Sequence, residues 1–299
     1  MSEQTKDDRM TTWLITGASS GLGRALARAV LDKGDNAVVT ARSTDSVKEL
    51  VDAHPDTALA VPLDVTDHVQ VAAAVAQATE RFGGVDVLVN NAGHGYRAAV
   101  EEAADEEVAE LFATNFFGPV DLIKQVLPQM RARRAGAIVN VSSIGAPRSN
   151  PASGYYTATK AALEGVSDAL NREVAPLGIR VLVLEPGAFR TDFSGRSLLQ
   201  SAATIDDYAD TAHRRRKEND HTHGTQPGDP ARAAQAIIQA VEAEQAPFRL
   251  LLGSDAIEIV RTEYTQRLAE IEAWTHLSVT TDFPTTGTDG TDGTEEATA

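Results

Sequence analysis

A tyrosine and a lysine stand four positions apart near the middle of the chain, at Tyr156 and Lys160, where a helical pattern begins. Side chains with this spacing lie on the same face of a helix, one turn apart. A neighbouring ammonium group favours the phenolate, so we expect Lys160 to lower the pKa of Tyr156 from its usual value of about 10. Such a phenol can give and take protons near neutral pH. Because the spacing is common by chance, its meaning depends on the rest of the chain.

A glycine-rich segment near the start of the chain indicates a site for a dinucleotide. An apolar run at residues 12–16 predicts a buried strand, and residues 24–31 have the period of a helix. Between them, Gly17 permits a tight turn, Gly21 allows the backbone to approach a pyrophosphate, and Gly23 allows the helix to pack closely on the strand. The pyrophosphate would meet the free N–H groups and the positive dipole of the helix N-terminus.

The end of the next predicted strand, residues 36–41, bears on which nicotinamide dinucleotide would bind. An acidic residue at this position would hold the ribose 2′-hydroxyl group of NAD. The chain instead has Ala41 followed by Arg42, and a guanidinium can pair with a 2′-phosphate through two parallel hydrogen bonds. The sequence therefore favours NADP(H), with NAD(H) as the alternative.

Apolar runs alternate with helical patterns along most of the chain, which predicts an α/β fold. The predicted strands are near-continuous runs of Val, Ile and Leu, as in a parallel sheet that is buried on both faces. We expect a single doubly wound domain, with a parallel sheet of about seven strands and helices on both faces. Strands are predicted at residues 12–16, 36–41, 58–63, 85–89, 137–141, 179–184 and 248–252, and helices at 24–31, 46–53, 69–82, 106–133 with an interruption near 115–119, 154–177, 230–243 and 256–274.

Three stretches depart from this alternation. Residues 1–10 are polar and of mixed charge, which predicts a flexible extension. Residues from about 192 to 228 are polar and follow a strand end, so we expect an insertion that covers the pocket. Residues 278–299 repeat Thr, Asp and Gly without an apolar face, which predicts a disordered acidic tail. The domain itself is expected to span residues 11–277.

The composition argues against several classes of function. The net charge of −16 and the pI of about 4.8 disfavour nucleic acid or an anionic membrane as a partner. The chain has no cysteine, which excludes disulfides and thiolate chemistry. His221 and His223 have no evident third ligand, so we expect no metal site. No apolar run approaches the roughly 18 residues of a membrane span, and the N-terminus does not resemble a signal peptide, so a cytoplasmic protein is expected.

Five motifs, in order, resemble those of the short-chain dehydrogenase/reductase family. They are the glycine turn that begins at Thr16, Asp64-Val65, Asn90-Asn91-Ala92-Gly93, Ser143 with Tyr156 and Lys160, and Pro186-Gly187 followed by Thr191. The resemblance covers roughly residues 12–275. Only Tyr156, and not Tyr155, has a lysine four residues later. Ser143 rather than Ser142 stands thirteen positions before that tyrosine, which is the usual spacing in the family.

The resemblance implies a Rossmann-type fold and a role for each matching residue. Tyr156 would be the general acid or base, Lys160 would lower its pKa and bind the nicotinamide ribose, and Ser143 would hydrogen-bond the substrate oxygen. Asn115 would hold a water that connects Lys160 to solvent. The family's preference rule also assigns Ala41 to the NADP(H) type. Many NADP-type relatives, however, have a basic residue inside the glycine turn, where this chain has Ser19 and Ser20. The implied cofactor-binding residues are Gly17, Ser19, Ser20, Gly21, Leu22, Gly23, Arg42, Asp64, Val65, Asn91, Ala92, Gly93, Tyr156, Lys160, Pro186, Gly187 and Thr191.

The predicted reaction interconverts a ketone or aldehyde and an alcohol on a fairly bulky, apolar small molecule. His94, Phe189 and Phe193 are expected to contact the substrate beside Ser143 and Tyr156. Further apolar side chains are expected from Tyr96, Leu198, Leu199 and Tyr208. A non-catalytic nucleotide-binding regulator, and an epimerase or dehydratase on the same scaffold, remain as alternatives. The resemblance also implies a homodimer or homotetramer, formed through the long helices that follow the fourth and fifth strands.

Overall fold

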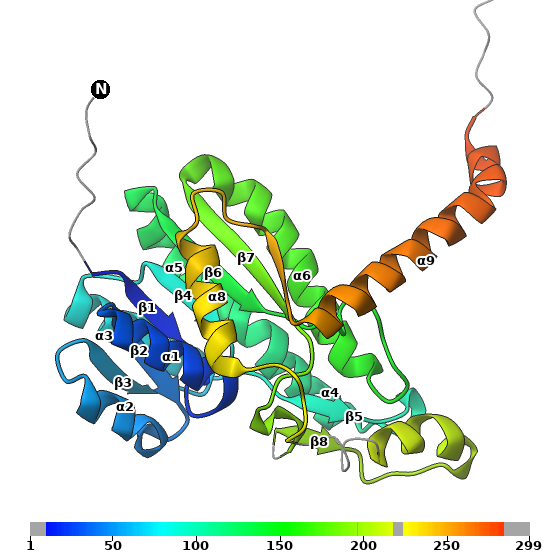
Figure 1. Ribbon diagram of the computed structural model, residues 1–299, viewed down its shortest axis with the longest axis horizontal. Helices are drawn as coiled ribbons and strands as arrows, with labels where there is room; N and C mark the ends of the chain where they lie inside the picture. The colour runs from blue at the N-terminus through cyan, green and yellow to red at the C-terminus, as the bar shows by residue number, and fades with distance from the viewer. Residues whose placement is uncertain (1–9, 196, 218–223, 284–299) are drawn as a thin grey trace, which may run out of the picture. The chain divides into compact units, whose positions relative to one another are not determined.

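Seven parallel strands form the central sheet in the computed structural model, which describes residues 10–195, 197–217 and 224–283 (Figure 1). The order is β3-β2-β1-β4-β6-β7-β9, so the direction of winding changes between β1 and β4, where ligand clefts form in such sheets. The predicted doubly wound α/β fold is confirmed. The strands are β1 (Thr12–Ile15), β2 (Asn36–Ala41), β3 (Ala58–Pro62), β4 (Val87–Asn90), β6 (Gly136–Val141), β7 (Ile179–Pro186) and β9 (Arg249–Leu252).

Helices cover both faces of the sheet because successive strand residues point to opposite sides. Leu14 in β1 belongs to one apolar cluster, whereas its neighbours Trp13 and Ile15 belong to the other, and all three are at most 1% exposed. The face that Leu14 joins carries α3 (His68–Phe82), α5 (Gly118–Arg133) and α6 (Gly154–Val174). The opposite face carries α1 (Gly21–Lys33), α2 (Lys48–Ala53) and α8 (Pro230–Glu242).

The interruption predicted near residues 115–119 takes the form of one turn of π-helix, Ala113–Phe117. This turn joins α4 (Asp105–Phe112) to α5 without a gap. A π turn inserts one residue into the helical ladder and is frequent at functional sites. Asn115 lies in this turn and is 0% exposed, so its amide is directed into the protein. Pro119 follows in the first turn of α5, where a missing N–H is tolerated.

The polar stretch after β7 contains regular structure where the structure describes it (Figure 1). It contains the short turns η5 (Asp192–Ser194) and η6 (Asp206–Tyr208), the strand β8 (Leu198–Gln200) and a π turn, Ala209–His213. Strand β8 pairs in parallel with β5 (Gly95–Arg97), with Gly95 opposite Leu198. Periodicity did not predict this second sheet because each of its strands has only three residues. The pairing ties the insertion to the segment that follows β4.

The chain divides into two units, Met1–Val260 and Arg261–Ala299. The first unit contains all the strands and helices named above. Helix α9 (Ser254–Ser278) begins in the first unit and ends four residues beyond the predicted end at residue 274. In the second unit, the turn η8 (Val279–Thr281) falls within the stretch assigned to the acidic tail. The rest of that tail, residues 284–299, and residues 1–9 of the N-terminal extension lie outside the described residues.

Candidate active site

A pocket of about 580 Å³ lies at the carboxyl ends of the central strands. Its volume is in the usual range of about 300–1,000 Å³ for small-molecule and cofactor sites. Of the predicted catalytic residues, Ser143, Tyr156 and Lys160 line this pocket, and Asn115 does not. Of the predicted cofactor residues, Gly23 does not line it, and the others do: Gly17, Ser19, Ser20, Gly21, Leu22, Arg42, Asp64, Val65, Asn91, Ala92, Gly93, Tyr156, Lys160, Pro186, Gly187 and Thr191.

The glycine turn has the backbone that a pyrophosphate site requires. Gly17 and Gly21 have φ angles of 67° and 57°, in the left-handed region that glycine adopts most easily. A β-carbon on Gly23 would overlap the Asn91 side chain, whose Nδ2 donates a hydrogen bond to the Thr16 carbonyl oxygen at 2.8 Å. No side chain caps the start of α1, so its first N–H groups remain available to an anion. The turn therefore fits a dinucleotide.

The strand ends beside the turn present groups of opposite charge. Arg42 has an exposed side chain at the edge of the pocket. Asp64 lines the same pocket, but its Oδ1 already accepts hydrogen bonds from the Thr66 N–H at 3.0 Å and the Thr66 hydroxyl at 2.7 Å. The Asp64 carboxylate is thus fixed by its own loop, whereas Arg42 is free to turn toward a ligand phosphate.

Helix α6 and the end of β6 bring three polar side chains together. Lys160 Nζ donates a hydrogen bond to the Val141 carbonyl oxygen at 2.8 Å and lies 5.9 Å from the centre of the Tyr156 ring. Ser143 Oγ accepts a hydrogen bond from the Gly145 N–H at 2.9 Å. A β-carbon on Gly145 would lie 3.2 Å from Ser143 Oγ and 3.6 Å from Tyr156 Cε1, so the serine and the tyrosine face the same small space.

The ionisation of Tyr156 differs from the expectation based on its neighbour. Burial raises the pKa of Tyr156 above its ordinary value, against the opposing effects of a hydrogen bond with Ser143 and the charge of Arg97. Burial also lowers the pKa of Lys160 to about 8. The expectation that Lys160 lowers the pKa of Tyr156 is therefore wrong here, because burial disfavours the charged form of each group and the Nζ atom is held by a backbone carbonyl. At neutral pH the phenol is protonated.

Asn115 lies behind the pocket and supports its wall. Its Oδ1 accepts a hydrogen bond from the His94 N–H at 3.0 Å, and its Nδ2 donates to the His94 carbonyl oxygen at 2.9 Å. Nδ2 also lies 3.3 Å from Thr159 Oγ1, on the helix that carries Lys160. A β-carbon on Gly93 would be 3.0 Å from Asn115 Oδ1 and 3.6 Å from Lys160 Nζ. The π turn thus joins the segment after β4 to α6.

The predicted substrate residues occupy the other end of the pocket. His94, Phe189 and Phe193 line it, and the Phe193 ring lies 5.8 Å from the Tyr156 ring between centroids. Burial lowers the pKa of His94, which favours its neutral form.

Two aromatic residues expected in the pocket lie elsewhere. The hydroxyl groups of Tyr96 and Tyr208 donate to Glu107 at 2.5 Å and to Glu101 at 2.6 Å, and neither tyrosine lines the pocket. Leu199 lines the wall, but its neighbour Leu198 does not. The sequence order of these residues does not reveal which way each side chain points.

The sequence profile of the family described as short chain dehydrogenase matches residues 11–201. The chain belongs to the short-chain dehydrogenase family. It is 39% identical over 247 residues to the 3-ketodihydrosphingosine reductase of Bacteroides thetaiotaomicron, covering 80% of this chain and 87% of that protein. A short-chain dehydrogenase structure from Streptomyces avermitilis has 44% identity and a TM-score of 0.86, over 94% of this chain and 100% of the other. One from Burkholderia cenocepacia in complex with NADP has 26% identity and a TM-score of 0.68, over 89% and 97%.

Membership in the short-chain dehydrogenase family sets the class of chemistry. The protein is an oxidoreductase that acts on CH–OH and C=O groups with NAD(P). The structure adds two supporting residues of this short-chain dehydrogenase that sequence motifs did not indicate. Glu164 Oε1 accepts a hydrogen bond from Ser142 Oγ at 2.6 Å, next to Ser143. Asp255 Oδ2 accepts from the Ala188 N–H at 2.7 Å and fixes the loop after β7. Only the tertiary contacts of these two acids distinguish them from surface carboxylates.

Two further expectations concern metals and membranes. Within residues 10–195, 197–217 and 224–283, the structure contains no group of three or more His, Cys, Asp or Glu side chains that could hold a metal ion. His221 and His223, whose sequence spacing raised the question of zinc, lie outside the described residues. Among the helices in the described part of this short-chain dehydrogenase, none is both long and apolar enough to cross a membrane.

Proposed function

We propose that this protein is an NADP(H)-dependent oxidoreductase that interconverts a ketone or aldehyde and an alcohol on a fairly bulky, apolar small molecule. The observation that carries the proposal is a single pocket lined by the glycine turn, by Ser143, Tyr156 and Lys160, and by the Phe189 and Phe193 rings. A nucleotide held at one end of such a pocket would have its reactive ring beside the groups that handle protons. A shared pocket supports hydride transfer better than separate binding and proton-handling sites would.

The proposed roles follow from the position and ionisation of each side chain. The bound nicotinamide supplies or accepts the hydride. In reduction, Tyr156 donates its phenolic proton to the carbonyl oxygen, and its raised pKa keeps that proton in place at neutral pH. Ser143 Oγ donates a hydrogen bond to the same oxygen, where negative charge develops. Lys160 would hold the nicotinamide ribose, while Asn115 fixes the His94 backbone and connects to α6 through Thr159.

The preference for NADP(H) over NAD(H) rests on Arg42. Arg42 is exposed and directly follows β2, next to Ala41, which occupies the position where an acid would otherwise hold a ribose 2′-hydroxyl. A guanidinium pairs well with a phosphate in this position, and the Burkholderia cenocepacia relative was solved with NADP. Asp64, Val65, Asn91, Ala92, Gly93, Pro186, Gly187 and Thr191 would line the rest of the cofactor site, with Ser19, Ser20 and Leu22 at the pyrophosphate.

The proposed substrate is apolar because the pocket offers aromatic and aliphatic surface beside Tyr156. Phe189, Phe193 and Leu199 form this part of the wall, and His94 stands next to them in its neutral form. The similar protein from Bacteroides thetaiotaomicron carries the name 3-ketodihydrosphingosine reductase, which indicates a ketone substrate for that relative. We therefore place long-chain and bulky ketones first in the search for a substrate.

The test is the consumption of NADPH with a panel of such ketones, using Tyr156→Phe and the adjacent Tyr155→Phe as a matched pair. Tyr156→Phe should reduce kcat by about 10²–10⁴-fold, because it removes the proton donor, while NADPH binding remains measurable by fluorescence. Tyr155→Phe should retain activity, since its hydroxyl donates to the Val100 carbonyl oxygen at 3.0 Å, away from Ser143.

Three outcomes would contradict the proposal in different ways. Full activity in Tyr156→Phe would show that the proton donor is another group. Nucleotide binding without turnover across the panel would indicate a non-catalytic regulator. A product formed without net loss of NADPH absorbance would indicate an epimerase or a dehydratase.

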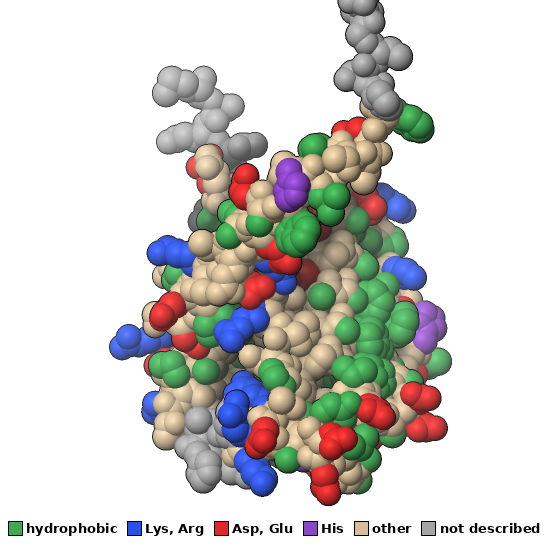
Figure 2. All heavy atoms as spheres, turned by 90° about the vertical axis from the view of Figure 1, so that its right-hand side faces the viewer, with side chains coloured by type: hydrophobic (Ala, Val, Ile, Leu, Met, Phe, Trp, Pro, Cys, Tyr) green, Lys and Arg blue, Asp and Glu red, His purple; other side chains and the backbone are tan. Residues whose placement is uncertain are grey.

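The cellular location and assembly form part of the same proposal, as a cytoplasmic homodimer or homotetramer whose enzyme domain spans residues 11–277. Phe117 and Val166, on the long helical segments after β4 and β6, are 60% and 36% exposed, as expected at a subunit interface. Figure 2 shows hydrophobic side chains concentrated toward the right of the face that it presents. Light scattering should give a multiple of the 31.7 kDa chain mass, and a mass of one chain would contradict this part of the proposal.

A further inference from the structure

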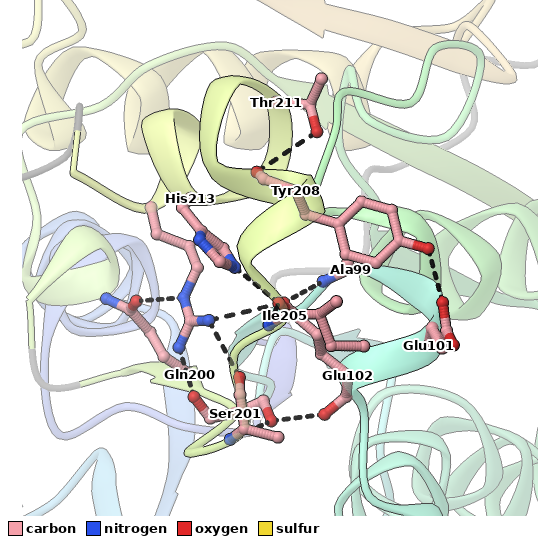
Figure 3. Close-up of polar contacts among 11 residues, drawn as sticks. Ala99, Glu101, Glu102, Gln200, Ser201, Ile205, Tyr208, Thr211 and His213 are labelled. Carbon is pink, nitrogen blue, oxygen red and sulfur yellow. Dashed lines mark hydrogen bonds and ion pairs between the residues drawn. The ribbon is translucent and has the colours of Figure 1, made fainter.

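Glu102 has a fully buried carboxylate that the proposed reaction does not use, with a side chain that is 0% exposed. Its Oε1 accepts a hydrogen bond from the Ile205 N–H at 2.7 Å and lies 2.5 Å from His213 Nε2. Its Oε2 accepts from the Ala99 N–H at 3.1 Å and lies 3.6 Å from Arg216 Nη1 (Figure 3). Three of these four partners belong to the insertion after β7, so one carboxylate joins points spread along that segment.

Neighbouring contacts connect the same two segments. Ser201 Oγ donates a hydrogen bond to the Glu102 carbonyl oxygen at 2.6 Å, and the Tyr208 hydroxyl donates to Glu101 Oε2 at 2.6 Å (Figure 3). Arg216 also donates to the Ser201 carbonyl oxygen, so two residues of the insertion that contact Glu102 are bonded to each other. The insertion is thus held to residues 101–102 by polar contacts at several points.

The charge on Glu102 depends on these partners. Burial by itself would raise the pKa of this carboxyl, but the hydrogen bonds from His213, the Ile205 N–H and the Ala99 N–H outweigh that effect and hold the pKa below its ordinary value. The group is therefore ionised at neutral pH. A buried charge is tolerated only when it is paired and hydrogen-bonded, and removing it would leave the facing donors unsatisfied.

Residues 201–216 of the insertion have little apolar core with which to hold their place. Among residues 201–216, only Ser201 and Ala212 are buried, and most of the others are exposed. The apolar cluster beneath this segment has Ala99, Ala152 and Ala212 as its buried members. The half-buried Tyr208 also packs against this cluster, but the three buried methyl groups contribute little, since a methylene-sized group provides about 0.8 kcal/mol. The polar contacts centred on Glu102 are therefore important in fixing the segment.

The same segment forms part of the pocket. Ser197 and Leu199 line the wall, and Leu199 lies in β8 opposite Tyr96 of β5. A β-carbon on Gly95 would lie 2.7 Å from Leu198 Cδ1 and 3.3 Å from the Phe193 ring, so the insertion packs directly on β5. Any displacement of β8 would change the space beside Phe193.

We infer that Glu102 is a positioning residue for substrate binding. Its carboxylate holds residues 198–216 against β5 and so sets the position of Ser197 and Leu199 in the pocket wall. This inference rests on the proposed function, because a substrate wall presupposes a substrate. At the nucleotide end, the glycine turn follows β1 and Arg42 follows β2, whereas the partners of the Glu102 carboxylate described above are Ala99, Ile205, His213 and Arg216. The effect of Glu102 should therefore fall on the ketone and spare the nucleotide.

The test compares Glu102→Ala and Glu102→Gln with Glu106→Gln, which removes one charge from an exposed position on α4. Hydrogen exchange of residues 198–216 and steady-state kinetics with a ketone from the panel are measured for each. Glu102→Ala should speed exchange in this segment and raise the KM for the ketone by about 10- to 100-fold, with the KM for NADPH within about twofold of wild type. Glu102→Gln should be intermediate, because an amide oxygen still accepts from the Ile205 N–H but carries no charge. Glu106→Gln should match wild type.

A second variant covers the case in which Glu102→Ala does not fold, as judged by circular dichroism. His213→Ala removes one partner from the side of the insertion and should change exchange and the ketone KM in the same direction by a smaller factor.

The outcomes separate this inference from the proposed function. Unchanged exchange in a folded Glu102→Ala or in His213→Ala would overturn the holding role. Faster exchange with an unchanged KM for the ketone would overturn the link to the pocket wall. If wild-type protein turns over no ketone, the proposed function fails and the substrate role of Glu102 fails with it, while exchange still decides whether Glu102 holds the segment.

Discussion

The side chains that meet in the pocket differ in how firmly the fold holds them. Lys160 Nζ donates a hydrogen bond to the Val141 carbonyl oxygen at 2.8 Å, and Ser143 Oγ accepts one from the Gly145 N–H at 2.9 Å. Arg42, by contrast, is exposed at the rim. A constrained group can act on the reacting atoms with little reorganisation, whereas an exposed arginine can pair with a ligand phosphate through two parallel hydrogen bonds. Arg42 is therefore the residue at which cofactor preference can be changed without disturbing the proton-handling groups.

We expect Arg42→Glu to reverse the cofactor preference. The substitution removes a cation and places a carboxylate where a 2′-phosphate would lie, so binding of NADPH should weaken by roughly 10- to 100-fold, while NADH should be affected little. The measurement is the ratio of kcat/KM for NADPH to that for NADH. Arg148→Glu, at an exposed position that does not line the pocket, makes the same charge change and should leave the ratio unaltered. A wild-type enzyme that strongly prefers NADH would show that Arg42 has been misread.

The turns between the elements of the sheet control the shape of the site. The Asn91 amide crosses from the end of β4 and donates to the Thr16 and Gly17 carbonyl oxygens at 2.8 and 3.2 Å. This contact holds the glycine turn in place and requires that residue 23 have no side chain. Farther along the sheet, Glu185 and Pro186 pair with β9, which extends β7 two residues past its predicted end. Each of these features is set by contact between elements that are distant in the sequence.

We expect Gly23→Ala to destabilise the protein and weaken nucleotide binding. The added methyl group would overlap the Asn91 amide and the Gly17 carbonyl oxygen, and overpacking of this kind costs about 1–3 kcal/mol. The matched control is Gly165→Ala, in the middle of α6, where no atom lies within 4 Å of the new β-carbon. That control should stabilise the protein by about 0.5–1 kcal/mol. Urea unfolding midpoints measure both effects, and equal midpoints for the two variants would contradict the prediction.

At the scale of the whole molecule, the protein has a strong negative net charge, and two of its acidic residues, Glu164 and Glu185, are buried near the β7–β9 edge of the sheet. The net charge is −16. Glu185 in β7 is 1% exposed, and Arg249 Nε lies 3.6 Å from Glu185 and 3.4 Å from Glu164. Burial, followed by the charge of Glu164, raises the pKa of Glu185 to about 7, although Arg249 acts in the opposite direction. The folded protein thus retains a proton that the unfolded chain releases near its ordinary pKa of 4.5.

Stability should therefore fall as pH rises from about 4.5 to about 7 through the Glu185 contribution, since the native state binds more protons than the unfolded state in this window. Glu185→Gln stays neutral and should not show this decrease. Between pH 5 and pH 8, the free energy of unfolding should fall by on the order of 2 kcal/mol more in wild type than in Glu185→Gln. Urea denaturation at the two pH values measures it. Glu244→Gln, at an exposed position, should behave like wild type. Identical pH dependence in wild type and Glu185→Gln would refute the assignment.

The amino-acid sequence by itself determined the fold class and the order of the seven central strands along the chain. Except for Gly23 and Asn115, the residues that it assigned to the cofactor and to catalysis line the pocket. Hydrophobic period and turn residues are local properties, and family motifs keep their order along the chain. They led to the prediction of Tyr156 rather than Tyr155 and of Ser143 rather than Ser142. They also predicted an irregularity near Asn115, which the structure resolves as a π turn.

Only the tertiary structure decided the ionisation of Tyr156, the supporting contacts of Asn115 and the place of the insertion. The pKa of Tyr156 depends on desolvation, which no spacing of residues encodes. Tyr96 and Tyr208 turn away from the pocket because their hydroxyl groups meet acids on other elements. Glu102 meets His213 across 111 residues of sequence, so its role appears only when the chain is folded. Tyr156 and Lys160 are near neighbours on a helix, and even there the surrounding protein sets their chemistry.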